Sequence, residues 1–209
     1  MAQPHSAGPF SLWLEQTIQS LHNIKGAYVP CGSCTACCRS SYFITIRPDD
    51  TQTIEHIPGE LLFPAPNLPE GSRVLGYDRK GNCPVFKKGR CSIYAYRPLT
   101  CRQYDCRVFS ATGLDPAVDG KILVSERSKS WHFDFPAKRD REEFSAVQMA
   151  AQFLNTFRDR FPRKSFPSNT TQLAVKAVSL YQVFLGFEDF KSINIEKTIH
   201  RIMKEYGNQ

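Results

Sequence analysis

Residues 31–38 read Cys-Gly-Ser-Cys-Thr-Ala-Cys-Cys, a C-x2-C-x2-C-C run that places four thiols within one short stretch. A two-residue gap lets the chain turn so that successive thiolates can meet at one metal ion. The glycine and serine of the first gap permit the tight turn that this requires. Successive side chains of an extended stretch point in opposite directions, so we expect the adjacent Cys37 and Cys38 to face different partners.

A second group of cysteines follows at wider spacing, and no cysteine lies outside positions 31 to 106. Eight thiolates permit two four-thiolate sites, or one such site with additional structural thiols. The spacing alone does not show which cysteines share a site, although a hairpin would bring Cys83 and Cys91 together. The expected metal ligands are Cys31, Cys34, Cys37, Cys38, Cys83, Cys91, Cys101 and Cys106.

Whether the cysteines form disulfides or bind metal depends on the cellular compartment of the protein. The first residues, Met-Ala-Gln-Pro-His-Ser, lack the basic and apolar regions of a signal peptide, and the most apolar stretch, 173–187, is interrupted by Lys176 and Gln182. We therefore expect a cytoplasmic protein without a membrane span. Clustered cysteines in that compartment more often bind metal or act in catalysis than form disulfides.

The metal itself stays open between zinc and an iron–sulfur cluster, since four-sulfur coordination suits both. Three thiolates at two-residue spacing with a remote fourth are typical of [4Fe–4S] sites, whereas zinc sites more often use C-x2-C pairs. The ferredoxin continuation C-x3-C-P is missing here. The spacing therefore favours iron–sulfur and keeps zinc as the alternative.

The second group lies in Cys83-Pro84 and in residues 91–106, Cys-Ser-Ile-Tyr-Ala-Tyr-Arg-Pro-Leu-Thr-Cys-Arg-Gln-Tyr-Asp-Cys. With the C-x2-C-x2-C-C run, this pattern resembles the YkgJ-like cysteine-cluster family, whose domains are regarded as zinc- or iron-chelating. The resemblance covers about residues 28–108 and implies metal binding. A similar cluster is associated with flagellin lysine N-methylases, which would imply cluster-dependent methyl transfer.

Two classes of function follow. The first is a metal-binding protein that acts as carrier, sensor or structural adaptor, and the second is an enzyme or enzyme component that carries out methyl transfer or another modification. The chain has no Gly-rich phosphate loop, nucleophile elbow, H-E-x-x-H pair or acidic dyad, so no catalytic residue can be named. Whether the protein is an enzyme stays open at this point.

The formal net charge of +7 counts every thiol as neutral. Thiolates would reduce it, so the charge gives no reason to expect a nucleic-acid partner. Arginines close to the cysteines could instead lower the pKa of the thiols or offset the charge of a cluster, or they could be ordinary solvated side chains. These arginines are Arg39, Arg97, Arg102 and Arg107.

We expect the aromatic and histidine residues near the cysteines to have mainly structural roles. We expect the tyrosines to pack around a small metal core, and a lone histidine among aromatics, His132, is usually structural rather than a ligand. A protein partner is expected to bind through the C-terminal helices. The tyrosines are Tyr94, Tyr96 and Tyr104.

The predicted fold is α+β, a small cysteine-rich metal-binding domain with short hairpins, an N-terminal helix before it and helices after it. The expected domains are residues 1–27, 28–110 and 111–209. Expected helices cover 11–25, a segment from 48–50 to 58–59, 144–161, 173–184 and 190–203. Ser11 is available as the cap of the first helix, and Gly207 is expected to end the last one. Expected strands cover 42–46, 74–78, 83–86 and 90–94, with a proline-rich loop at 58–71. The turns Lys80-Gly81-Asn82 and Lys87-Lys88-Gly89 are expected to join the last three strands as hairpins.

Overall fold

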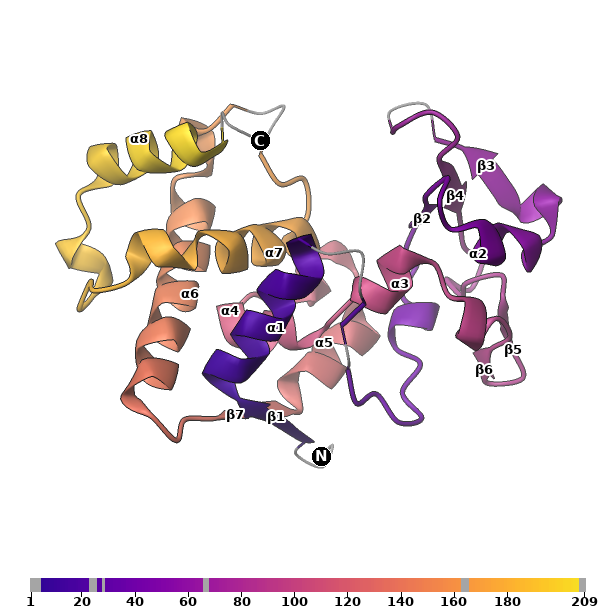
Figure 1. Ribbon diagram of the computed structural model, residues 1–209, viewed down its shortest axis with the longest axis horizontal. Coiled ribbons are helices and arrows are strands. Elements are labelled where there is room, and N and C mark those ends of the chain that lie inside the picture. Colours follow the sequence, from indigo (N-terminus) through magenta and orange to yellow (C-terminus); the bar gives the residue numbers. More distant parts are fainter. Residues whose placement is uncertain (1–4, 23–25, 28, 66–67, 163–165, 207–209) are drawn as a thin grey trace. The chain divides into compact units, whose positions relative to one another are not determined.

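The computed structural model describes residues 5–22, 26–27, 29–65, 68–162 and 166–206. Helices and small sheets make the fold α+β, as predicted, and the chain divides into two compact units (Figure 1). Unit 1 consists of Met1–Ile18, Cys106–Asp119 and Ser125–Gln209. Unit 2 consists of Gln19–Asp105 and Gly120–Val124 and carries the first seven cysteines.

Unit 1 is built around helix α6 (Lys138–Thr156), which packs against α7 (Thr170–Leu180) and α4 (Arg107–Thr112). Buried residues at helical spacing form one apolar stripe along α6, and such a stripe drives a helix onto a core. The helix α8 (Ile195–Tyr206) completes this part of the chain. The stripe consists of Ala146, Val147, Ala150, Phe153 and Leu154.

The C-terminal helices are placed as predicted, but their ends differ. The α6 helix ends at Thr156, where Phe157 leaves helical geometry, and a 3-10 turn at Arg158–Arg160 follows before Pro162. Similar 3-10 turns occupy Tyr181–Phe184 and Phe190–Ser192, which we expected to be helical. The predicted stop at Gly207 lies outside the described residues.

The N-terminal helix α1 spans Phe10–His22 and matches the predicted helix 11–25, of which 23–25 are outside the described residues. Ser11 lies inside the helix and is not its cap. Asp140 supplies the cap instead, because its Oδ1 accepts a hydrogen bond from the Ser11 amide at 2.8 Å and its Oδ2 accepts one from the Ala137 amide at 2.9 Å. One carboxylate thus caps two helices that are distant in sequence.

Sequence analysis missed several short elements of unit 1. The strands β1 (His5–Pro9) and β7 (Trp131–Asp134) form a parallel pair, which joins residues too far apart for periodicity to connect. The helix α4 and the helix α5 (Ile122–Lys129) were also not predicted. No helix among the described residues is both long and apolar enough to cross a membrane.

Unit 2 holds a three-stranded antiparallel sheet with the order β2–β4–β3, formed by Ile44–Ile46, Arg73–Leu75 and Leu62–Pro64. A small hairpin, β5 (Phe86–Lys87) and β6 (Arg90–Cys91), follows. Two short helices, α2 (Thr51–Glu55) and α3 (Leu99–Gln103), complete the unit. Its compact core consists of Ile44, Ile46, Ile57, Leu75, Cys83, Val85 and Ile93.

Two predictions for unit 2 were wrong. The segment 58–71 is not only loop, since it contains β3, and its Pro64 is tolerated because β3 is an edge strand. Strand β4 pairs with β2 and β3 rather than with 83–86. The turn between β4 and 83–86 is closed by the Asp78 amide, which donates to the Asn82 carbonyl at 2.8 Å. The strand expected at 83–86 is reduced to Phe86–Lys87.

The turn of the β5–β6 hairpin agrees with prediction. Lys88 and Gly89 both have positive φ, 51° and 76°, which suits the tight turns that close two-residue hairpin loops. The hairpin places Cys91 opposite Phe86, and the Phe86 amide donates to the Cys83 carbonyl at 2.8 Å. Cys83 and Cys91 are therefore held at the same end of the hairpin.

Candidate metal centre

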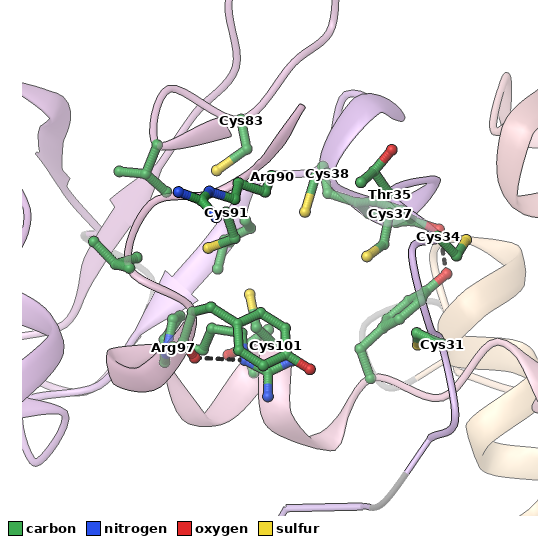
Figure 2. A pocket seen from close by; sticks show the side chains of 18 of the residues that line it. Cys31, Cys34, Thr35, Cys37, Cys38, Cys83, Arg90, Cys91, Arg97 and Cys101 are labelled. Atoms are coloured by element: carbon green, nitrogen blue, oxygen red, sulfur yellow. Dashed lines mark hydrogen bonds between the residues drawn. The ribbon is translucent and has the colours of Figure 1, made fainter. Parts of the chain in front are cut away.

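Seven of the eight cysteines line one cavity of about 350 Å³ in unit 2 (Figure 2). Aromatic rings and two arginines, Arg90 and Arg97, complete its wall, and none of its described lining residues is a carboxylate. A wall of thiols without carboxylates is a donor set for soft, thiophilic metals and is unsuited to Mg²⁺ or Ca²⁺. The cysteines are Cys31, Cys34, Cys37, Cys38, Cys83, Cys91 and Cys101.

Backbone hydrogen bonds join the two cysteine groups of the sequence at this cavity. The Cys83 amide donates to the Cys38 carbonyl at 2.8 Å, and the Ser41 amide donates to the Gly81 carbonyl at 2.9 Å. Cys38 lies in a 3-10 turn, Cys37–Arg39, at the end of the C-x2-C-x2-C-C run. The end of this run is therefore tied directly to the start of the second group.

Cys101 reaches the cavity from α3, whose position depends on buried polar contacts. Oδ1 of Asp50 accepts a hydrogen bond from the Leu99 amide at 2.9 Å in the first turn of α3. The Thr100 hydroxyl donates to the Thr45 carbonyl at 2.7 Å and fixes the helix to β2. The side chains of Asp50 and Thr100 thus position the helix that carries Cys101.

The electrostatics of the cavity oppose thiolates unless a cation is present. Burial raises the pKa of the thiols of Cys83, Cys91 and Cys101, and the negative charge of neighbouring cysteines adds to this increase. For Cys37, a hydrogen bond with the Cys38 side chain is the largest cause of its raised pKa. A bound metal supplies the missing positive charge and would deprotonate its ligands.

Arg97 acts in the opposite direction, because its charge lowers the pKa of Cys91 and Cys101. Its guanidinium lies 3.6 Å from the centroid of the Tyr94 ring, and its Nε donates to the Tyr94 carbonyl at 2.9 Å. The side chain is therefore held in place beside the thiols. This geometry supports the expectation that an arginine near the cysteines offsets the charge of a metal–thiolate centre.

The thiols surround the cavity rather than converge on one point. As the side chains stand, the described residues contain no group of three or more His, Cys, Asp or Glu placed to hold a metal ion. A tetrahedral zinc site with Zn–S bonds of 2.3 Å needs sulfurs about 3.8 Å apart. Figure 2 shows the sulfurs of Cys37, Cys38 and Cys101 directed toward the open middle of the cavity.

Comparison with known families agrees with this donor set. Residues 30–123 match the family model described as "CxxCxxCC: Putative zinc- or iron-chelating domain". The matched region is called the CxxCxxCC domain below. All eight cysteines fall within the match, which confirms the resemblance drawn from their spacing. No curated protein and no solved structure matches the chain.

The eighth cysteine of the CxxCxxCC domain has a different environment. Cys106 belongs to unit 1 and is not among the residues that line the cavity. It is buried, and the indole Nε1–H of Trp131 donates a hydrogen bond to its Sγ at 3.3 Å. The sequence carries no sign of this difference, because the partner of Cys106 comes from a strand that periodicity did not predict.

The remaining arginines and tyrosines divide between the cavity and other contacts. Arg102 lies 3.5 Å from Asp50, and Arg107 lies over the Trp131 ring at 6.0 Å. Arg39 is exposed. Tyr94 and Tyr104 line the cavity of the CxxCxxCC domain, as expected, whereas Tyr96 stacks on His56 with ring centroids 3.6 Å apart.

Histidines take no part in the wall of the cavity. His132 has its Nδ1 3.1 Å from the Ser130 carbonyl, in agreement with a structural role. Among the aromatic and charged side chains of the wall, sequence analysis missed Tyr42, Phe43 and Arg90. Only Arg90 had a usable signal, because it directly precedes Cys91 in a predicted strand.

Proposed function

We propose that the CxxCxxCC domain holds an iron–sulfur cluster in its cysteine cavity and that this cluster is the structural centre of unit 2. The observation that carries the proposal is the arrangement of seven thiols around a single cavity of about 350 Å³. The family description, zinc- or iron-chelating, includes this assignment. With the cluster in this structural role, the domain acts as a metal-dependent adaptor or carrier rather than as a catalyst.

The size of the cavity favours a cluster over a single zinc ion. A structural zinc ion draws four ligands to about 2.3 Å and leaves no room between them. A cuboidal cluster contains several irons and sulfides, so its thiolates stand farther apart around a larger centre. The seven thiols around a cavity of about 350 Å³ support the second arrangement.

A structural role follows from the small core of unit 2. Its core is made of a few aliphatic side chains together with Cys83, and Cys38, Cys91 and Cys101 pack against them. Cys38, Cys91 and Cys101 come from three separate segments: a 3-10 turn, a hairpin strand and a short helix. A centre that bonds all three would cross-link the unit, and structural metals contribute roughly 10–16 kcal/mol of apparent binding free energy.

Anaerobic purification followed by metal analysis, sulfide analysis and visible absorption tests the proposal. We expect a brown protein that contains iron and acid-labile sulfide in comparable amounts and bleaches when exposed to air. A colourless protein with stoichiometric zinc would refute the cluster and leave a zinc-binding domain. Preparations from zinc-supplemented and iron-supplemented cultures should be compared, so that the metal supply does not decide the result.

A second candidate, an enzyme component for methyl transfer, has two observations in its favour. The cavity contains more thiols than one four-thiolate centre uses, and two exposed rings lie on its wall, Phe43 at 68% exposure and Tyr94 at 61%. A small organic ligand could contact such rings. If S-adenosylmethionine shifts the absorption or EPR spectrum of the cluster, the enzyme is favoured; an unchanged spectrum favours the adaptor.

An adaptor also needs a partner, which we place on the C-terminal helices. Leu185, Ile195 and Met203 are apolar side chains of this region that remain partly exposed, at 37–41%. The described helices α6, α7 and α8 supply a folded support for such a surface. We predict that the partner is a protein that binds here through an apolar surface.

A further inference from the structure

The β5–β6 hairpin of unit 2 carries a concentrated positive charge. Its turn and flanking positions contain Lys87, Lys88 and Arg90, and all three side chains are exposed. None of the three forms an ion pair with a residue that the structure describes. The charge of the hairpin is therefore not neutralised within the described part of the chain.

The register of the hairpin places two of these charges opposite each other. Lys87 and Arg90 are partners across the two strands, and Lys88 between them has a φ of 51°. Like charges at facing positions destabilise an antiparallel pair, and a turn with positive φ favours Asn, Asp or Gly over Lys. The hairpin thus keeps its cations against local preference, which is typical of residues that serve a function.

The preceding turn of unit 2 has a different arrangement of charge. Its cations, Arg79 and Lys80, are also exposed. They share their turn with Asp78, whose carboxylate accepts hydrogen bonds from the amides of Lys80 and Asn82 at 2.8 and 2.9 Å. A carboxylate accompanies the cations of this turn, so the excess of positive charge belongs to the β5–β6 hairpin.

The hairpin reaches the cysteine cavity. Gly89, Arg90 and Tyr94 line the cavity and are also exposed, so the cavity opens to solvent beside the hairpin. The Tyr94 ring carries the Arg97 guanidinium 3.6 Å from its centroid. Figure 2 shows Arg90 and Arg97 on the same side of the cavity as Cys91. An anionic group bound at the hairpin would lie beside this opening.

We propose that this basic surface is the docking site for an acidic segment of a partner protein, which binds beside the opening of the cysteine cavity. The proposal rests on the proposed function in one respect, because an adaptor or carrier must bring its metal centre to a second protein. It gives unit 2 a surface whose chemistry differs from the apolar surface of the C-terminal helices. The basic surface consists of Lys87, Lys88, Arg90, Tyr94 and Arg97.

The composition of the basic surface favours a protein over a nucleic acid. Tyr and Arg are enriched at protein interfaces and among the residues that dominate their affinity, and the surface contains Tyr94 with two arginines. Arginine also binds carboxylates through two parallel hydrogen bonds. Strongly salt-dependent DNA binding uses about 6–10 phosphate contacts. The few cations of this surface match a short acidic segment instead.

Fluorescence anisotropy with the full, metal-loaded chain tests the proposal. The probe is a fluorescein-labelled peptide of alternating Asp and Glu, and the comparison probe is a labelled oligo(dT) strand of the same net charge. We expect the peptide to bind saturably at an ionic strength of about 0.05 M, and its affinity to fall about ten-fold or more at about 0.5 M. A peptide that does not bind, or an oligo(dT) strand that binds more tightly than the peptide, would overturn the proposal.

A pair of double variants locates the binding. Lys87→Gln with Lys88→Asn removes two charges, and asparagine suits the positive φ of position 88. These substitutions should weaken binding of the peptide about ten-fold, because charges across an interface set its complementarity. Arg79→Gln with Lys80→Gln removes the same charge from the preceding turn and should bind the peptide as the wild type does. Equal weakening in both double variants would assign the binding to net charge and contradict a docking site.

Metal analysis of the same preparations separates this proposal from the proposed function. Both double variants should keep the wild-type metal content and absorption spectrum, since none of the four substituted residues is a thiol. A wild-type chain that purifies with zinc would refute the cluster, yet its peptide binding and the contrast between the variants would remain. Loss of metal from the hairpin variant alone would show that Lys87 and Lys88 support the fold of the cavity, and this would overturn the docking site.

Discussion

The main chains of Cys38 and Cys83 are joined by one hydrogen bond, in which the Cys83 amide donates to the Cys38 carbonyl at 2.8 Å. This bond connects the last cysteine of the first group to the first cysteine of the second. The sheet β2–β4–β3 lies between them in sequence, so the bond also closes the unit around its core. Two groups that look separate in the sequence are thus parts of one site.

Removal of the metal should unfold unit 2 and leave unit 1 largely intact. The core of unit 2 is small and includes a cysteine, whereas unit 1 has fully buried Phe10, Phe153 and Phe184 in its core. Limited proteolysis of the chelated full chain should cut first within residues 29–105, with a loss of far-UV dichroism. A metal-free protein as ordered and as resistant as the loaded one would contradict this prediction.

Cys106→Ala should keep the metal. The substitution removes the acceptor of the Trp131 indole hydrogen bond and should reduce the free energy of unfolding of unit 1 by about 0.5–1.5 kcal/mol. Cys101→Ser is the contrasting variant, because Cys101 lines the cavity and its loss should release the metal. Metal content and urea unfolding measure both effects; loss of metal from Cys106→Ala would return this residue to the ligand set.

Asp50→Ala should loosen α3 and with it the metal. The Asp50 side chain is almost fully buried, and its carboxylate accepts hydrogen bonds from the amides of Leu99 and Arg47 at 2.9 and 3.1 Å. Leaving buried donors without an acceptor costs roughly 1–3 kcal/mol, and Cys101 lies in the affected helix. Faster metal release to a chelator should accompany the lower stability.

Its neighbour provides the control for this variant. Asp49 is half-exposed and pairs with Arg47 at the surface at 3.3 Å, an arrangement that contributes about 0–1 kcal/mol. Asp49→Ala should therefore change neither the unfolding midpoint nor the rate of metal release measurably. Equal effects at both positions would show that charge in this loop, and not the cap of α3, is responsible.

Gly26→Ala should destabilise unit 2 through a steric clash. A Cβ atom at Gly26 would lie 2.7 Å from the Cβ of Arg102 and 2.9 Å from its carbonyl oxygen, and the backbone atom has little freedom to move. Such overpacking costs about 1–3 kcal/mol. Gly59→Ala is the matched control, because no atom lies within 4 Å of its added Cβ, and thermal unfolding should separate the two variants.

Asp140→Asn should change the pH dependence of the stability of unit 1. The hydrogen bond from the Ser11 amide is the largest cause of the lowered pKa of Asp140. A lowered folded-state pKa contributes stability above the unfolded-state value, about 3.9, and this contribution disappears as the pH falls through the folded-state pKa. The variant should be less stable than wild type at pH 7, with the difference shrinking below pH of about 4.

An exposed carboxylate of the same helix gives the reference for this pH measurement. Glu142 pairs with Lys138 at the surface, at 3.0 Å and with 53% of its side chain exposed. Unfolding of Glu142→Gln should follow the wild-type curve from pH 7 to pH 3. A constant difference between wild type and Asp140→Asn over that range would show that the cap acts through shape and not through charge.

The sequence by itself determined the local features of this protein. Thiol spacing identified the metal-binding stretch, hydrophobic periodicity placed the N-terminal and C-terminal helices, and the Lys88-Gly89 turn identified the β5–β6 hairpin. These are local properties, because a turn, a helix face or a C-x2-C knuckle is set by residues a few positions apart. The domain boundaries expected from composition, 1–27, 28–110 and 111–209, stay a prediction.

Only the tertiary structure decided which cysteines meet. Spacing did not show which of the eight share a site, whereas in the structure seven line one cavity and Cys106 is hydrogen-bonded to Trp131 in the other unit. The same limit hid the β1–β7 pair and the Asp140 cap. Each depends on contacts between segments far apart in sequence, and their formation is governed by packing and backbone hydrogen bonding of the whole unit, which a local pattern does not encode.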